Sequence, residues 1–406
     1  MNMKKVAFVT VAAMALAFWT AGCAGPRAGQ GTYRLSWDKE PVAHGHFVDV
    51  GNYLLIQEDV LYSEYAAVLE NIAQRHDVFR GGCTATAKRN RKGDVILGRN
   101  MDVEISQNPA VMTRIVGGPY ETVSFYYGGI ATPYSYAQLD EIDADLAFLR
   151  RCAFNGTDAL NEAGLYVEAN MREMDAERDL YCPGTNPGKP RACMLSVPAL
   201  VTANCATVPE ALAFLKDSFD WYTLGYHSVP LRWNLAFMIG DALGNYGLVE
   251  FANNRIYFTP CANGQGNYYI HPEIAEYADV GSGYGRLAAA LEGLAECETA
   301  EDMLHNMEAC MWRREILDPG CLGYSDVVDS LKARRASTPE ELQRRMEAEM
   351  VPHQAAAREF YAGNEKPLRD DGAIWTTGFN FGVNCAEKRL LLRLWENDGV
   401  IVEYRW

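Results

Sequence analysis

A cysteine, an arginine and an aspartate stand close together in the sequence, at a spacing that could support nucleophilic catalysis. Cys83 follows two glycines, Arg99 comes sixteen residues after it and Asp102 nineteen residues after it. A guanidinium near a thiol lowers the pKa of the thiol and favours the nucleophilic thiolate. Asp102 could hold an ammonium group or orient the arginine. A buried cysteine beside a structural ion pair would give the same pattern, so these three residues leave both interpretations open.

The three residues are predicted to lie on the two strands of one hairpin. Residues 84–87 and 95–97 have strand-like composition, and the polar run 88–94 between them is typical of a turn. A hairpin centred near Arg91 pairs positions whose numbers add up to about 183, which brings residues 98–100 opposite Cys83. Arg99 and Asp102 therefore return to the cysteine across one turn. The basic run 88–92 is interpreted as a solvated hairpin end.

The rest of the chain alternates helical and strand-like blocks without regular strand–helix repetition. A helix is expected between Tyr53 and Val78, where apolar residues recur at three-and-four spacing. Further strands are predicted at 235–239, 246–251, 255–259 and 374–406. Further helices are predicted at 208–219, 285–297, 299–311 and from about 338 onward. This organisation favours an α+β or layered architecture.

The N-terminus has the layout of a bacterial export signal. A short basic region, 1–5, precedes an uncharged apolar stretch, 6–18, and small residues lead into Cys23. The segment resembles a lipobox in which Cys23 would be lipidated, although Thr20 replaces the usual aliphatic residue; an ordinary cleaved signal is the alternative. The apolar stretch is shorter than the ~20 residues of a spanning helix. We expect an exported, lipid-anchored protein of the bacterial cell envelope, bound to the membrane only through Cys23.

The composition excludes several classes of function. A chain of 406 residues with 49% hydrophobic residues can bury a large core, and its net charge of −16 disfavours a nucleic-acid partner. The eleven cysteines include no CxxC or CxxH spacing, so no metal or cofactor is expected. The pairs Cys182–Cys193 and Cys310–Cys321 could close short disulfide loops. The GxSxG and HExxH motifs of serine hydrolases and metalloproteases are absent.

The segment Cys83-Thr84, followed by Gly98-Arg99-Asn100-Met101-Asp102, resembles the signature of the choloylglycine hydrolase family. That family includes bile salt hydrolases and penicillin V acylases, and its wider relatives are linear-amide C–N hydrolases and acid-ceramidase-like amidases. Residues 158–165 resemble the strand-entry motif of the family. The likeness covers residues 83 to about 300 and is strongest at 83–102.

The resemblance also points to three later residues. Asn170 lies where the family has an oxyanion asparagine, and residues 267–269 are similar to the segment with a second one, at Asn267. Arg286 matches the late active-site arginine of the family. No threonine precedes Asn267, and a shifted alignment would place His271 at that site instead.

The fold implied by the resemblance is α+β, with the four-layer αββα arrangement of the N-terminal-nucleophile hydrolases. Self-cleavage between Gly82 and Cys83 would make Cys83 the first residue, because its thiol would attack the carbonyl of Gly82. Residues 1–23 would be the signal peptide with its lipobox, 24–82 a tether and propeptide, and 83–406 the catalytic amidase domain. An apolar face expected on residues 62–73 would keep the upstream piece bound.

The implied reaction is hydrolysis of a linear, non-peptide amide C–N bond. The freed α-amine would act as general base, Arg99 would support the thiolate, Asp102 would position the α-amine and Arg286 would complete the polar network. Asn170 and Asn267 would stabilise the oxyanion. The substrate would be a small N-acyl amide such as a conjugated bile salt, penicillin V or an N-acyl amino acid.

Two alternatives remain at this stage. An acyltransferase would use the same acyl-enzyme, with an amine in place of water as the acceptor. A non-catalytic exported binding protein could keep the fold without the reaction, although the presence of Cys83, Arg99, Asp102 and Asn170 together argues against this. The sequence is also compatible with a homo-oligomer.

Overall fold

The fold was analysed in a computed structural model of the chain. The structure describes residues 32–34, 46–48, 55–65, 81–104, 110–126, 141, 145–172, 186–222, 234–274, 284–310, 375–394 and 401–406. The chain divides into two compact units, Met1–Thr32 and Tyr33–Trp406, and the second contains the elements that carry the site. The predicted export signal, Cys23 and the helix expected from about 338 lie outside the described residues. In the ranges described, no helix is long and apolar enough to cross a membrane.

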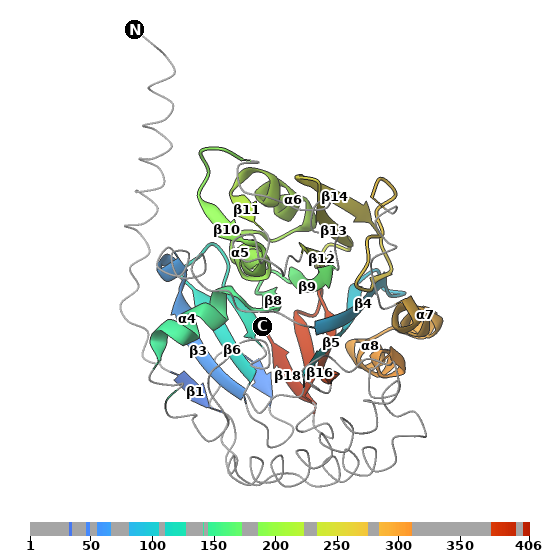
Figure 1. Ribbon diagram of the computed structural model, residues 1–406. Coiled ribbons are helices and arrows are strands. Elements are labelled where there is room, and N and C mark those ends of the chain that lie inside the picture. Colours follow the sequence, from blue (N-terminus) through green and yellow to red (C-terminus); the bar gives the residue numbers. More distant parts are fainter. Residues whose placement is uncertain are drawn as a thin grey trace, which may run out of the picture. The chain divides into compact units, whose positions relative to one another are not determined.

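Two large sheets make up the core of the described residues (Figure 1). In the first, the strand order is β1 (Thr32–Arg34), β3 (Leu55–Leu61), β6 (Ala110–Val116), β7 (Thr122–Tyr126), β8 (Asp158–Asn161), β9 (Tyr166–Arg172), β12 (Asn234–Gly240), β13 (Tyr246–Ala252) and β14 (Arg255–Pro260). In the second, it is β15 (Gly264–Gln265), β4 (Gly81–Arg89), β5 (Val95–Glu104), β16 (Trp375–Asn384), β17 (Arg389–Leu394), β18 (Val402–Arg405) and β2 (His46–Val48). Strands β10 (Arg191–Cys193) and β11 (Asp220–Tyr222) form a small parallel pair.

Four of the described α-helices pack against the two large sheets, and the fifth packs against another helix. The α-helices are α4 (Leu146–Phe154), α5 (Val197–Asn204), α6 (Val208–Asp217), α7 (Tyr284–Glu292) and α8 (Ala300–Asn306). Short 3₁₀ turns lie at Tyr62–Glu64, Met194–Ser196, Leu294–Glu296 and Met307–Cys310. Helices α4 and α5 contact strands of the first sheet, and α7 and α8 contact strands of the second. Helix α6 packs against α5.

The alternation of side chains along each strand separates the two faces of the first sheet. On β7, the ring of Phe125 packs edge-on against Phe379 and Phe381 of β16, with centroids 4.8 and 5.0 Å away. On the opposite face of β7, the Thr122 hydroxyl bonds that of Thr202 on α5 at 2.7 Å. One face of this sheet therefore meets the second sheet, and the other meets helices.

The second sheet is covered by helices in the same way. On β5, the Asn100 amide donates to the carbonyl of Met307 at 2.8 Å, in the turn that follows α8. A Cβ added at Gly98 on this face would stand 2.7 Å from the Met307 side chain, so the close approach of this turn requires glycine there. The layers thus run helix, sheet, sheet, helix, which confirms the four-layer αββα arrangement predicted from the sequence.

The predicted hairpin of Cys83 and Arg99 is confirmed, with its register moved by one residue. Cys83 pairs with Met101 and Ala85 pairs with Arg99, so the turn is centred on residue 92, midway between 83 and 101, instead of on Arg91. The turn closes through a bond from Asn90 N to Asp94 O, with Gly93 at φ +91°. A shift of one position exchanges the faces of a strand. Met101, and not Asn100, therefore lies opposite the cysteine.

The helix expected between Tyr53 and Val78 is wrong over its first part. Leu55–Leu61 forms β3, which pairs in parallel with β6, and only a short 3₁₀ turn follows it at Tyr62–Glu64. Strand pairing with β6 overrides the helical spacing, because tertiary contacts outweigh a local pattern. Residues 66–78 lie outside the described residues.

Most other predicted elements are confirmed where the structure describes them. The strands β12, β13 and β14, the helices α6, α7 and α8, and the closing strands β16, β17 and β18 occupy the predicted stretches to within a few residues. The two disulfide candidates remain predictions, because Cys182 and Cys321 lie outside the described residues. Cys193 and Cys310 are buried.

Candidate active site

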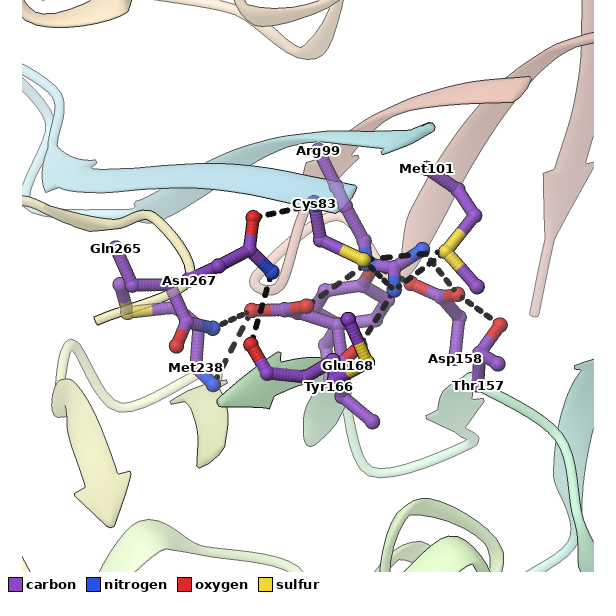
Figure 2. A network of polar contacts seen from close by, with 12 residues as sticks. Cys83, Arg99, Met101, Thr157, Asp158, Tyr166, Glu168, Met238, Gln265 and Asn267 are labelled. Atoms are coloured by element: carbon purple, nitrogen blue, oxygen red, sulfur yellow. Dashed lines mark hydrogen bonds and ion pairs between the residues drawn. The ribbon is translucent and has the colours of Figure 1, made fainter. Parts of the chain in front are cut away.

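The main-chain nitrogen of Cys83 is held by a side chain and not by a neighbouring strand. The ladder between β15 and β4 pairs Gln265 with Ala85 and ends there, two residues short of Cys83. At Cys83 the side-chain oxygen Oδ1 of Asn267 accepts a hydrogen bond from the nitrogen at 3.0 Å (Figure 2). Asn267 thereby satisfies a buried backbone donor that strand pairing leaves over.

The thiol of Cys83 is fully buried between the two sheets. Its sulfur lies 3.7 Å from Nη2 of Arg99 and 3.2 Å from Sδ of Met101. Burial raises the pKa of the Cys83 thiol to about 12, against the lowering influence of Arg99. Glu168 and Asp102 raise this pKa further. The thiol is therefore neutral at ordinary pH, and a base would have to remove its proton before the sulfur could act as a nucleophile.

Arg99 crosses from the second sheet into a pair of carboxyl groups on the first. Its Nη1 lies 2.9 Å from Oδ2 of Asp158, and its Nε lies 2.7 Å from Oε2 of Glu168. Nη2 also donates to the carbonyl of Ala169 at 2.6 Å. Burial acts to lower the pKa of Arg99, but Asp158, Cys83 and Glu168 outweigh it and raise that pKa. The guanidinium is thus a fixed positive charge with a defined orientation beside the sulfur.

The carboxyl group of Glu168 sits at the centre of this network. Besides Arg99, it contacts the main-chain nitrogen of Met238 at 3.2 Å and the side-chain amide of Gln265 (Figure 2). Burial raises the pKa of Glu168 to about 7, although Arg99 acts in the opposite direction. Glu168 therefore changes its charge close to neutral pH, and it is one of the residues that orient Arg99.

This titration predicts a pH-dependent stability. Because the pKa of Glu168 is about 7 in the folded chain and about 4.5 ordinarily, its contribution is fully present below pH 4.5 and is lost as the pH rises through 7. Relative to Glu168→Gln, the free energy of unfolding should fall by about 2 kcal/mol between pH 5 and 8. Denaturant titrations of both proteins, in a Cys83→Ala background, measure this difference. Parallel pH profiles would contradict it.

Asp102 and Arg286 meet on the other face of the hairpin. Nε of Arg286 lies 3.3 Å from Oδ2 of Asp102, and its Nη2 donates to Oδ1 of Asn267 at 2.9 Å. Thr377 donates to Oδ1 of Asp102 at 2.6 Å. Asp102 was expected to position the nitrogen of Cys83, which stays a prediction. Arg286 joins Asp102 to Asn267, and Asn267 contacts that nitrogen.

Asn170 lies on β9, on the face that meets the second sheet. It stands two residues after Glu168, so the two side chains point the same way. Asn170 is fully buried, and within the described residues both polar atoms of its amide lack a hydrogen-bond partner. Buried polar groups are normally paired. An unpaired amide on this face is available to a ligand that enters between the sheets.

The structure brings Asn267, and not His271, against the cysteine. The Nδ2 atom of Asn267 donates to the carbonyl of Met171 at 2.8 Å, while its oxygen faces Cys83. The His271 ring packs on Tyr257, with centroids 5.0 Å apart, and its main-chain nitrogen bonds Glu250. Asn267 is therefore the residue at the site, and the side-chain atom it turns to Cys83 is its oxygen.

Several residues of the site were not predicted from the sequence: Asp158, Glu168, Gln265 and Met101. Asp158 was part of a motif without a role of its own. Glu168 carried a signal that was overlooked, because a charged residue stands there between the apolar residues of a fully buried strand, Tyr166–Arg172. A charge at such a position is paired or functional.

Fold and site together define a four-layer αββα protein with a cysteine buried between its sheets and an arginine and an asparagine against its sulfur and nitrogen. In the ranges described, no three potential metal ligands gather at one place. No protein-family model matches the sequence, and no curated protein matches it.

Several solved structures are similar to this chain. A variant of conjugated bile acid hydrolase from Clostridium perfringens is 12% identical, with a TM-score of 0.45, over 80% of this chain and 97% of that one. Penicillin V acylase from Agrobacterium tumefaciens is 13% identical, with a TM-score of 0.38, over 77% and 83% of the two chains. A second variant of the Clostridium enzyme is 14% identical, with a TM-score of 0.43, over 79% and 91%.

Proposed function

We propose that this chain is a self-processing cysteine amidase of the N-terminal-nucleophile type. The observation that supports it best is the contact between the nitrogen of Cys83 and Oδ1 of Asn267, 3.0 Å long and fully buried. Cleavage between Gly82 and Cys83 would turn this nitrogen into an α-amine, already held by a side chain. The sulfur of the same residue lies beside Arg99. Both atoms that the chemistry needs are therefore held by contacts with side chains.

Self-cleavage would proceed as an acyl shift followed by hydrolysis. The Cys83 sulfur attacks the carbonyl carbon of Gly82, and the peptide C–N bond breaks as the nitrogen takes a proton. Gly82 is then a thioester on the sulfur, and water hydrolyses it to a free carboxylate. The two glycines before Cys83 suit this step, since they leave the carbonyl accessible.

Amide hydrolysis would repeat the same chemistry on a substrate. The α-amine of Cys83, with an ordinary pKa of about 8, accepts the thiol proton as general base. The thiolate attacks the amide carbonyl, and the unpaired amide of Asn170 is suited to donate to the oxyanion. The α-ammonium then protonates the leaving amine, and water resolves the acyl-enzyme. The proposed substrate is a small N-acyl amide with a linear, non-peptide C–N bond.

The upstream piece is proposed to remain with the catalytic domain after cleavage. Strand β3 lies next to β6 in the first sheet, and Tyr65 is buried with its ring 5.0 Å from Phe154 and 6.0 Å from Phe219. Burial of one such aromatic side chain stabilises by roughly 1.5–3 kcal/mol. If Cys23 carries a lipid, this packing would keep the exported enzyme at the cell envelope.

N-terminal sequencing of the purified protein tests this proposal. Two chains should elute together, and one of them should begin Cys-Thr-Ala-Thr, because the Gly82–Cys83 bond is cut and the upstream piece stays packed. A panel of N-acyl amides then identifies the substrate class, with release of the free amine as the readout. Transfer of the acyl group to an added amine would instead indicate an acyltransferase. Recovery of active but uncut protein would refute the mechanism.

A further inference from the structure

The segment that carries Asn267 is anchored on one side by a buried arginine of the first sheet. Arg172, at the end of β9, is fully buried. Its Nη1 donates to the carbonyl of Gly266 at 2.5 Å, and its Nη2 donates to Oε1 of Gln265 at 2.6 Å. One guanidinium therefore holds Gln265 and Gly266, the two residues that immediately precede Asn267 in the chain.

A buried glutamate anchors the same segment on the other side. Glu250 of β13 is fully buried, and its Oε1 accepts from the main-chain nitrogen of Ile270 at 3.0 Å. Its Oε2 accepts from the nitrogen of His271 at 2.8 Å. Nε of Arg172 lies 3.3 Å from Oε1 of Glu250, so the two anchors form an ion pair with each other.

We propose that the ion pair of Arg172 and Glu250 is a clamp that positions Asn267 on the nucleophile. Asn267 lies between the two stretches that this ion pair holds by hydrogen bonds, 265–266 and 270–271. Asn267 also makes the contact to the nitrogen of Cys83. Arg172 and Glu250 are thus positioning residues for the reaction of Cys83, without touching it. This inference rests on the proposed amidase function and adds two residues to it.

The chemistry of the pair supports a positioning role. A buried ion pair contributes little net stability unless further hydrogen bonds satisfy both partners. Here those further bonds go to residues on either side of Asn267. Several directional contacts on a short segment fix its position more narrowly than apolar packing would, and a displacement of about 1 Å at a reacting group can cost a hundredfold in rate.

Arg172→Lys tests the clamp, because lysine keeps the charge but cannot reproduce the forked contact to Gln265 and Gly266. We expect kcat for an N-acyl amide to fall at least about tenfold, with KM changed less than about threefold. In an Asn267→Ala background the same substitution should lower kcat by less than about threefold, because the residue that it positions is absent. Losses that multiply in the double variant, or an unchanged kcat in Arg172→Lys, would overturn the proposal.

Arg114→Lys serves as a matched control. Arg114 also pairs with a carboxylate, that of Glu121, and it lies on β6 in the same sheet. Its substitution should leave kcat unchanged, although it also weakens an arginine–carboxylate pair. A loss as large as that of Arg172→Lys would attribute the effect to general destabilisation and would overturn the positioning role.

Hydrogen exchange separates this inference from the proposed function. In Glu250→Gln, the amides of Ile270 and His271 should exchange at least about tenfold faster, because the glutamine offers one acceptor oxygen in place of two. If the wild-type protein hydrolyses no N-acyl amide, the proposed function fails, and faster exchange confined to 264–271 still supports the anchoring. Unchanged exchange of these two amides would overturn the clamp, whatever the activity.

Discussion

Substitution of Cys83 by alanine is expected to leave the Gly82–Cys83 bond intact and to abolish amide hydrolysis. Alanine has no nucleophile for either step, whereas Arg99 and Asn267 stay in place around it. Cys83→Ser should process slowly at most, and its turnover should be lower by several orders of magnitude, since a neutral hydroxyl is a far weaker nucleophile than an activated thiolate. Intact-mass analysis measures the processing, and amine release measures the turnover.

Cys261→Ala provides the control for this experiment. Cys261 is an exposed free cysteine on the same chain, so its loss tests for effects of thiol removal in general. Processing and turnover should both match the wild-type protein. Substantial activity in Cys83→Ala would exclude Cys83 as the nucleophile and, with it, the proposed mechanism.

Substitution of Asn267 by alanine is expected to cost about a hundredfold in turnover, the loss typical of a displaced reacting group. Removal of its side chain leaves the buried nitrogen of Cys83 without its acceptor and takes one partner from Arg286. His271→Ala should stay within about tenfold of the wild-type rate, because His271 contacts Tyr257, Glu250 and Glu273 in the described part of the chain and not the cysteine.

The contrast between these two substitutions is best measured on fully processed protein, so that an effect on self-cleavage is recorded separately by mass. A large loss in His271→Ala together with a small loss in Asn267→Ala would show that the catalytic geometry differs from the one described. Equal and small losses would remove the asparagine from the mechanism.

The hairpin of Cys83 and Arg99 shows how much of the site the local sequence pattern could predict. The turn between residues 88 and 94 was visible in its polar residues, and it brought Arg99 back to Cys83 as predicted. Composition left the centre of the turn uncertain by one residue. A register shift of one residue decides which side chains share a face of the sheet. Arg99 and Met101 thus lie with the sulfur, and Asn100 faces the turn that follows α8.

The upstream segment shows where local pattern fails. Spacing at three and four residues favoured a helix, yet Leu55–Leu61 pairs as a strand with β6. Whether a segment can pair with a strand from a distant part of the chain is a long-range property, so a local stretch of sequence cannot predict it. The packing of Tyr65 against the rings of Phe154 and Phe219 is likewise a contact between distant parts of the chain.

By itself, the sequence determined the nucleophile candidate, its arginine and the mixed layered class, because these follow from residue types at fixed separations along the chain. It left Asn267 and His271 as alternatives, and the structure places Asn267 against the cysteine. Only the tertiary structure decided that Arg286 contacts both Asp102 and Asn267, and that Arg99 pairs with both Glu168 and Asp158. It also decided that Arg172 and Glu250 form hydrogen bonds with the residues on either side of Asn267. Periodicity states which face a side chain occupies, but the packing of one sheet on another selects its partner.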